Sequence, residues 1–154
     1  MEQREYATRQ LSFFYCGEIN ENTPELIQSL IRGLVSSRMW ACSPPVFVDA
    51  TDEVEPNNQY GDLPVRNLGG TLTIYAANEG LLPLNLDERT LDDVIALIES
   101  VLKFSAEHLM EFEFYLDHAF VGIISDGHMD ASLEKGLIDE WRQHLIAMKY
   151  KANA

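Results

Sequence analysis

Hydrophobic and polar residues alternate most clearly over residues 109–125, and this pattern predicts a β-hairpin. With Asp117-His118 as a two-residue loop, the expected pairs are Leu116 with Ala119, Phe114 with Val121, Phe112 with Ile123, and Met110 with Ser125. These pairs make one face almost wholly apolar, so a one-residue slip would turn glutamates toward the core. A longer loop over residues 116–119 stays an alternative, because Asp-His is not the pair that two-residue loops prefer. We expect Phe112, Phe114, Val121 and Ile123 in the core.

Three further runs, residues 11–16, 46–48 and 71–76, favour β-strands by their aromatic or β-branched content. Leu68-Gly69-Gly70 predicts a turn, while residues 49–67 and 78–88 predict long loops.

Three segments show apolar residues at helical spacing. The first begins at Thr23, the expected N-cap, and ends near Met39; Gly33 inside it costs about 1 kcal/mol relative to Ala. The second begins at about Thr90, with Asp93 completing a Thr-x-x-Asp cap. The third follows a cap at Asp130 or Ser132.

The predicted order is therefore β-α-β-β-α-β-β-α. This order favours an α+β fold with a mainly antiparallel sheet and three helices covering one face. The 154 residues are enough for one domain, 1–154, that buries about 70% of its unfolded surface. We expect residues 1–10 and 149–154 to fray.

Charge narrows the choice of partner. The chain has 25 acidic and 11 basic residues, a formal net charge of −14 and a pI near 4.5. Such a field repels phosphate backbones and anionic lipids and attracts basic surfaces. We therefore expect a basic protein as partner, with no nucleic acid and no membrane; an acidic surface that serves only solubility is the alternative. A polar N-terminus and the lack of an 18-residue apolar run indicate a cytoplasmic protein.

Acidic residues gather in the first predicted loop, where no helix end explains them. We expect this loop to bind the partner, with Tyr60 supplying apolar area beside Asp62. A solvated connection without a partner is the alternative. The candidate partner-binding residues are Asp49, Asp52, Glu53, Glu55, Tyr60 and Asp62, with Glu111 and Glu113 of the hairpin as a second surface.

Catalytic and metal-binding motifs are absent: the sequence has no P-loop, GxGxxG turn, nucleophile elbow, HExxH or EF-hand spacing. We expect no cofactor, no metal and no catalytic residue. The enzyme alternatives are a site at His128, between Asp126 and Asp130, or a carboxylate pair at Glu111 and Glu113, about 7 Å apart on one strand face.

The two cysteines, Cys16 and Cys42, have no CxxC or Cys/His spacing. We expect them to be reduced and structurally silent, and a disulfide between them stays open.

Residues 112–145, FEFYLDHAFVGIISDGHMDASLEKGLIDEWRQHL, combine an aromatic strand, a short turn, Phe-Val-Gly-Ile, Asp-Gly and Leu-x-x-Gly-Leu-x-x-x-Trp-x-x-x-Leu. This segment resembles small acidic immunity proteins encoded beside bacterial polymorphic toxins, including those of contact-dependent growth inhibition. The resemblance implies a cytoplasmic protein that binds one cognate toxin domain, frequently a basic nuclease, and blocks it without catalysis. These families share no functional motif, so the resemblance carries over only structural positions: Gly122, Gly127, Gly136 and Trp141.

The expected function is thus non-enzymatic neutralisation of a basic toxin domain. A small cytoplasmic enzyme and an acidic adaptor subunit are the alternatives.

Overall fold

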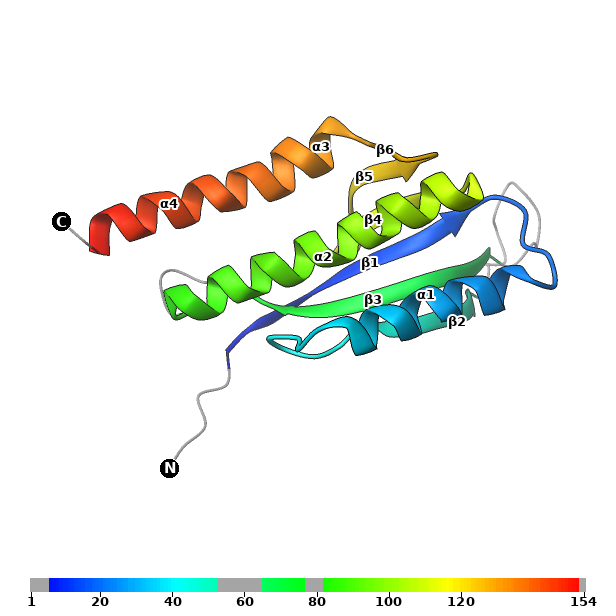
Figure 1. The fold of residues 1–154 in the computed structure, drawn as a ribbon, viewed down its shortest axis with the longest axis horizontal. Coiled ribbons are helices and arrows are strands. Elements are labelled where there is room, and N and C mark those ends of the chain that lie inside the picture. The colour runs from blue at the N-terminus through cyan, green and yellow to red at the C-terminus, as the bar shows by residue number, and fades with distance from the viewer. Residues whose placement is uncertain (1–5, 53–64, 77–81, 153–154) are drawn as a thin grey trace, which may run out of the picture.

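The computed structural model describes residues 6–52, 65–76 and 82–152. Within these ranges six strands form one antiparallel sheet, in the order β2-β3-β1-β4-β5-β6, with the helices on one of its faces (Figure 1). The elements are β1 (Thr8–Cys16), α1 (Thr23–Ser37), β2 (Val46–Asp52), β3 (Val65–Tyr75), α2 (Leu84–His108), β4 (Glu111–Leu116), β5 (Ala119–Ser125), β6 (His128–Met129), α3 (Ala131–Leu133), the π-helical stretch η1 (Glu134–Asp139) and α4 (Glu140–Ala152). The predicted α+β class is confirmed, with the two-residue β6 as an addition.

The chain ends are partly different from the expectation. β1 already includes Thr8–Gln10 and α4 reaches Ala152, so these stretches belong to regular elements. None of the described helices is long and apolar enough to cross a membrane.

The central strand is β1, which pairs with β3 on one side and β4 on the other. Leu11 and Phe13 point to the helix-covered face and are fully buried. Their neighbours Ser12 and Phe14 alternate to the opposite face, as strand geometry requires. Phe13 stacks on Phe114 with ring centroids 5.7 Å apart. The aromatic core predicted at the hairpin therefore extends to the middle of the sheet.

The two-residue hairpin loop is confirmed, and Asp117 explains why Asp-His can occupy it. Asp117 and His118 both have left-handed backbones, with φ of 47° and 73°. The Asp117 carboxylate accepts hydrogen bonds from Arg9 Nε at 2.7 Å and the Gln10 N–H at 2.8 Å. Contacts to β1 thus stabilise a turn that usually needs Asn-Gly.

The predicted hairpin register is right only next to the loop. Leu116 faces Ala119 as expected, but a β-bulge between Phe114 and Tyr115 shifts every later pair. Beyond it the pairs are Phe114 with Gly122, Glu113 with Ile123, Phe112 with Ile124, and Glu111 with Ser125.

The bulge changes which β5 residues enter the core. Ile124 is fully buried, whereas Val121 and Ile123, both predicted core residues, are only half-buried. A Cβ at Gly122 would lie 2.7 Å from Leu133 Cγ. The shifted register therefore places Gly122, the glycine of β5, where Leu133 of the last helix approaches that strand.

Gly69 and Gly70 do not form the predicted turn, since both lie inside β3. A Cβ at Gly69 would lie 1.8 Å from the Phe13 carbonyl oxygen, and one at Gly70 would lie 2.6 Å from Ile31 Cδ1. These glycines serve close packing of β3 against β1 and α1. With β3 starting at Val65 and β2 reaching Asp52, the expected loop over residues 49–67 is shorter at both ends.

The start of α1 at Thr23 is confirmed, but its N-terminal amides are held by Asn20. Asn20 Oδ1 accepts the N–H groups of Asn22 at 2.8 Å and Thr23 at 3.1 Å. The Thr23 hydroxyl contacts Asn20 in return, so it does not act as the predicted cap.

The predicted start of α2 at Thr90 is wrong. The helix begins at Leu84, where the Pro83 carbonyl accepts the N–H groups of Leu86 and Asp87. Thr90 lies a turn and a half inside and donates its hydroxyl to the Leu86 carbonyl at 2.8 Å. Asp93 is therefore a mid-helix residue and completes no cap.

Asp130 is at the N-cap of the last helix, as one of the two expected alternatives. Its backbone carbonyl accepts the N–H groups of Leu133 and Glu134. Its carboxylate instead accepts the Ile123 N–H at 2.9 Å, which ties the start of the helix to β5.

We expect Phe114→Ala to lower the free energy of unfolding by about 3–5 kcal/mol. The Phe114 side chain is fully buried against Phe13, so truncation leaves a cavity at the centre of the core. Denaturant melts measure the change, and a loss below about 1 kcal/mol would show that this face is not the core.

Two glycine substitutions should have opposite effects on stability. A Cβ at Gly33, inside α1, meets nothing within 4 Å, so Gly33→Ala should stabilise by about 1 kcal/mol through helix propensity. Gly69→Ala should destabilise by about 1–3 kcal/mol or more, because its Cβ overlaps the β1 backbone. Thermal and urea unfolding of both variants test this; equal effects would contradict the packing role of Gly69.

Candidate functional site

The predicted acidic loop is only partly described. Asp49 lies within β2 and Asp52 ends that strand, while Glu53, Glu55, Tyr60 and Asp62 fall outside the described residues. Asp49 accepts two hydrogen bonds from Arg66, from Nε at 2.8 Å and from Nη2 at 2.7 Å. These hydrogen bonds lower the pKa of Asp49 below its ordinary value of 3.8. Asp49 thus already has a basic partner within the sheet.

The second predicted surface, with Glu111 and Glu113 on β4, lies on the sheet face that the helices leave uncovered. Phe112 and Phe114 alternate with these glutamates and are fully buried on the opposite face. Glu113 accepts a 2.6 Å hydrogen bond from the Tyr115 hydroxyl. This hydrogen bond, assisted by burial, raises the pKa of Tyr115 to about 12. The structure therefore places both glutamates on one face but commits one of them to a neighbouring tyrosine.

Cys16 faces the same glutamates across the β1–β4 pair, where it is the direct partner of Glu111. Burial, followed by the charge of Glu113, raises the pKa of the Cys16 thiol to about 12. A thiol needs to ionise to act as a nucleophile or a metal ligand, so this one is protonated and unreactive at neutral pH.

The two cysteines are both free and lie at opposite ends of the sheet. Cys42 is close enough to Tyr75 to raise the pKa of that hydroxyl, together with the larger effect of burial. Tyr75 pairs with Thr8, at the start of the strand that Cys16 ends. Eight residues of extended strand span about 26 Å, which is far beyond a disulfide.

A shallow hollow of about 560 Å³ lies on the uncovered face. Its centre is the pair Ser12 and Thr71, whose hydroxyl oxygens are 3.0 Å apart. Phe14 and Tyr115 flank this centre with ring centroids 6.1 Å apart. The hollow is also bordered by Val65 and Arg66 at the start of β3, and by Glu113, Asp117 and His118.

His128, the alternative catalytic residue, is exposed in β6 and pairs with Ser125. The two aspartates beside it in the sequence serve the backbone: Asp126 has a left-handed turn conformation, and Asp130 accepts the Ile123 N–H. Among the residues that the structure describes, no group of three or more His, Cys, Asp or Glu side chains is placed to hold a metal ion.

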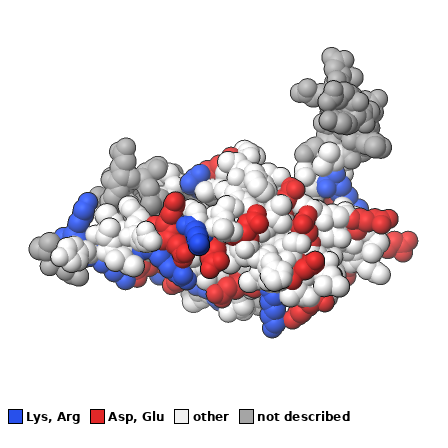
Figure 2. Space-filling model, turned by 90° about the horizontal axis from the view of Figure 1, so that it is seen from above, with Lys and Arg blue, Asp and Glu red and all other residues white. Residues whose placement is uncertain are grey.

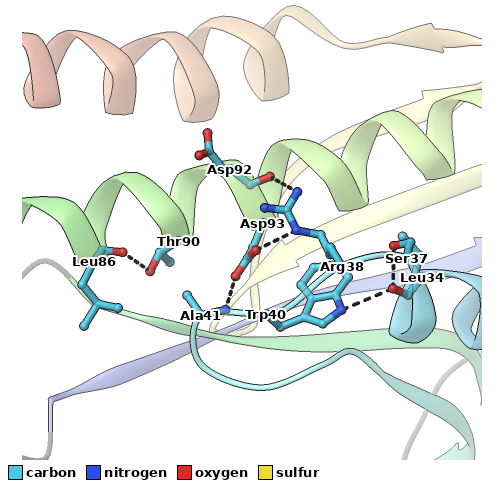
Figure 3. Close-up of polar contacts among 9 residues, drawn as sticks. All are labelled: Leu34, Ser37, Arg38, Trp40, Ala41, Leu86, Thr90, Asp92 and Asp93. Atoms are coloured by element: carbon cyan, nitrogen blue, oxygen red, sulfur yellow. Dashed lines mark hydrogen bonds and ion pairs between the residues drawn. The ribbon is translucent and has the colours of Figure 1, made fainter.

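A buried polar cluster around Asp93 was missed in the sequence. Asp93 Oδ2 accepts the Ala41 N–H at 2.7 Å, which fastens the segment after α1 to the middle of α2 (Figure 3). Arg38 Nε lies 3.1 Å from Asp93 Oδ1 in an ion pair, although without the geometry of a hydrogen bond. Arg38 Nη1 donates to the Asp92 carbonyl, and its guanidinium lies 5.5 Å from the Trp40 ring centroid. The sequence could have indicated this cluster only through the start of α2. A helix that begins at Leu84 has Asp93 in its third turn, where a carboxylate cannot act as a cap.

The environment of Asp93 disfavours its charge. Burial raises its pKa above 3.8, and the Ala41 N–H and Arg38 only partly oppose this. A second buried carboxylate, Asp87, accepts a 2.8 Å hydrogen bond from Trp141 Nε1 and joins α2 to α4. Both aspartates connect elements of the fold, so neither is available to a ligand.

Comparisons with protein-family models, with curated proteins and with solved structures found no match. The inference of function therefore depends on the charge and geometry of this chain.

The effect of Asp93 on stability should depend on pH with a defined sign. Its pKa is higher in the folded chain than in the unfolded one, so stability falls as pH rises from about 4 through the folded pKa. Asp93→Asn keeps the acceptor for the Ala41 N–H but has no proton to lose. The unfolding free energy of this variant minus that of the wild type should rise with pH over this window and then level off.

Asp117→Asn provides the control with the opposite sign. Its hydrogen bond from Arg9 lowers the pKa of Asp117, so the stabilisation is complete above about 4 and is lost as pH falls. The variant-minus-wild-type difference should therefore fall with rising pH. Urea melts across pH 3–7 measure both, and a parallel response of the two variants would refute the role given to burial at Asp93.

Proposed function

We propose that this protein is a non-enzymatic immunity protein that binds and neutralises a cognate basic toxin domain, a nuclease in the first instance, in the cytoplasm. The observation that carries the proposal is an uncovered sheet face with acidic and aromatic side chains, on a chain of net charge −14. In the view of Figure 2, acidic side chains lie over the middle and the right of the molecule, and basic ones are fewer there. A basic surface would thus be attracted over long range.

The side chains on the uncovered face suit arginine and lysine. Phe14, Tyr115 and Phe120 form a row, with ring centroids 6.1 Å and 5.8 Å apart. Phe120 is 53% exposed, so its ring is open to a partner. Aromatic rings attract cations, and Glu111 and Glu113 add carboxylates beside them. Nucleic-acid phosphates would instead be repelled.

The hollow on the uncovered face extends from the second predicted surface to one end of the predicted loop. It is bordered by Glu113 and also by Val65 and Arg66, which lie within the predicted loop over residues 49–67 and begin β3 in the structure. A toxin domain seated on this face would thus lie beside the residues that begin β3; Asp52 ends β2, and Glu53 and Glu55 fall outside the described residues. Asp49 is already paired with Arg66, so we expect it to contribute little to binding.

One hydrogen bond and one raised pKa argue against catalysis on this face. Glu113 is held by the Tyr115 hydroxyl, and the raised pKa of Cys16 keeps its thiol protonated. An inhibitor needs neither a general base nor a nucleophile, only charge and shape that complement the toxin.

A growth assay tests the neutralising function. Each gene next to this one in the source genome is expressed from an inducible promoter in a host that lacks both genes. One of them should arrest growth, and co-expression of this protein should restore it. If no neighbour arrests growth, or if arrest persists with the protein present, the proposal is wrong.

Glu111→Gln with Glu113→Gln should slow association with the purified toxin domain and reduce its dependence on ionic strength. Glutamine keeps the size of the side chain and an acceptor for the Tyr115 hydroxyl, so the double variant removes charge and little else. Charges at an interface rim act mainly on the association rate, and truncation of a desolvated pair costs about 2–5 kcal/mol. Stopped-flow association at several salt concentrations measures the effect.

The matched control is Glu99→Gln with Glu134→Gln. Both residues are exposed on the helices that cover the other face, and the net charge changes equally. Equal rates and salt slopes for the two double variants would exclude the uncovered face as the interface. The triple variant Asp52, Glu53 and Glu55 to Ala then reports separately on the acidic loop.

A further inference from the structure

A second hollow, of about 460 Å³, lies on the helix-covered face, between the sheet and the last helix. The sheet side of this hollow is formed by Ile74 near the end of β3, Ala76 just after that strand, and Leu116 at the end of β4. Leu137 and Trp141 border it from η1 and α4. We call this hollow the α4 groove. Its volume falls within the range of about 300–1,000 Å³ that is usual for small-molecule sites.

The α4 groove exists because the last helix leaves part of the sheet uncovered. Leu133 and Ile138 anchor this helix in the core, and the π-helical stretch, which includes Ile138, widens the helix at this point. Gly136, in that stretch, borders the groove, and a Cβ there would meet nothing within 4 Å. Single π-helical turns are frequent at functional sites. Residue 136 therefore has room for a side chain beside the groove, and glycine leaves that room empty.

The strong polar groups of the groove wall are already partnered. Trp141 Nε1 donates to Asp87, so the indole presents its ring to the groove and not its hydrogen-bond donor. Arg9 Nε donates to Asp117 at 2.7 Å, and that pair is about half exposed. The remaining titratable residues at the groove are Tyr75, which is half-buried, and Glu140 and His144, which are exposed at the rim. What the groove offers a ligand is therefore mainly apolar and aromatic surface.

We propose that the α4 groove binds a neutral, mainly apolar small molecule. An anion would approach Glu140 in a field of net charge −14, and the nearby Arg9 is already neutralised. A cation would find only the exposed Glu140, where solvent screens the attraction. A neutral ligand meets neither cost and gains from contact with Trp141 and Leu137. This site lies on the other face from the toxin-binding surface, so the two proposals are independent.

The test uses N-phenyl-1-naphthylamine, a neutral probe that becomes fluorescent in apolar surroundings. The chain has two tryptophans, so Trp40→Phe leaves Trp141 as the only energy donor. Titration of this variant should show saturable probe emission excited through Trp141, with one probe per chain. Probe emission without energy transfer would place the probe elsewhere and overturn the proposal.

Gly136→Phe should fill the groove and weaken probe binding about tenfold or more. Gly33→Phe is the matched control, because this helical glycine has the same open space but borders a different hollow, between α1 and α2. It should bind the probe as the wild type does. His144→Trp, at the exposed rim, narrows the mouth of the groove and should also weaken binding, even if Gly136→Phe fails to fold.

Three further results would overturn the proposal. They are the absence of saturable binding, equal binding by the Gly136 and Gly33 variants, and a dimer of the wild-type chain that only Gly136→Phe and His144→Trp dissociate. The last result, seen by sedimentation velocity, would assign the groove to a second copy of the chain.

Discussion

The volume of the Phe13 ring is the constraint on which the rest of this fold depends. Phe13 lies in the central strand, packs on Phe112 and Phe114 of β4, and is fully buried beneath the helices. A Cβ at Gly70 would come within 2.9 Å of this ring, so the close packing of β3 on the ring depends on the absence of a side chain at residue 70. A Cβ at Gly70 would also lie 2.6 Å from Ile31 Cδ1, so the same glycine lets α1 pack closely on the sheet.

The predictions from sequence were accurate where a single periodicity determines the structure. Phe112 and Phe114 were identified as core, and the start of α1 and the hairpin loop were located correctly. The predictions failed where the same short sequence motif occurs in two different structures. Gly69-Gly70 is typical of a turn, yet here it serves close packing, and Thr90 with Asp93 matches a capping motif inside a longer helix. The bulge in the hairpin places Gly122 beside Leu133, a neighbour that no pattern within the hairpin contains.

The acidic residues differ widely in what they can offer a partner. Asp87 and Asp93 are buried in contacts between elements, while Asp49 and Asp117 are paired with arginines. A count of acidic residues cannot distinguish these four carboxylates from those on the uncovered face. Their neighbours show that part of the negative charge holds the fold together. On the uncovered face, Glu113 is bound only by the neutral Tyr115 hydroxyl, so it and Glu111 keep their charge for recognition. Identification of the first group required the three-dimensional structure, because each partner is distant in sequence.

The position of β1 at the centre of the sheet also affects how the chain can fold during synthesis. Leu11 pairs with Leu72 and with Leu116, so its second partner is made about a hundred residues after it. Until β4 leaves the ribosome, β1 has an unpaired edge and Phe13 lacks two of its ring neighbours. A nascent chain at that stage presents an apolar strand edge that other chains can pair with. Translation speed and chaperone access between β3 and β4 should therefore influence the yield of folded protein more than events at either terminus.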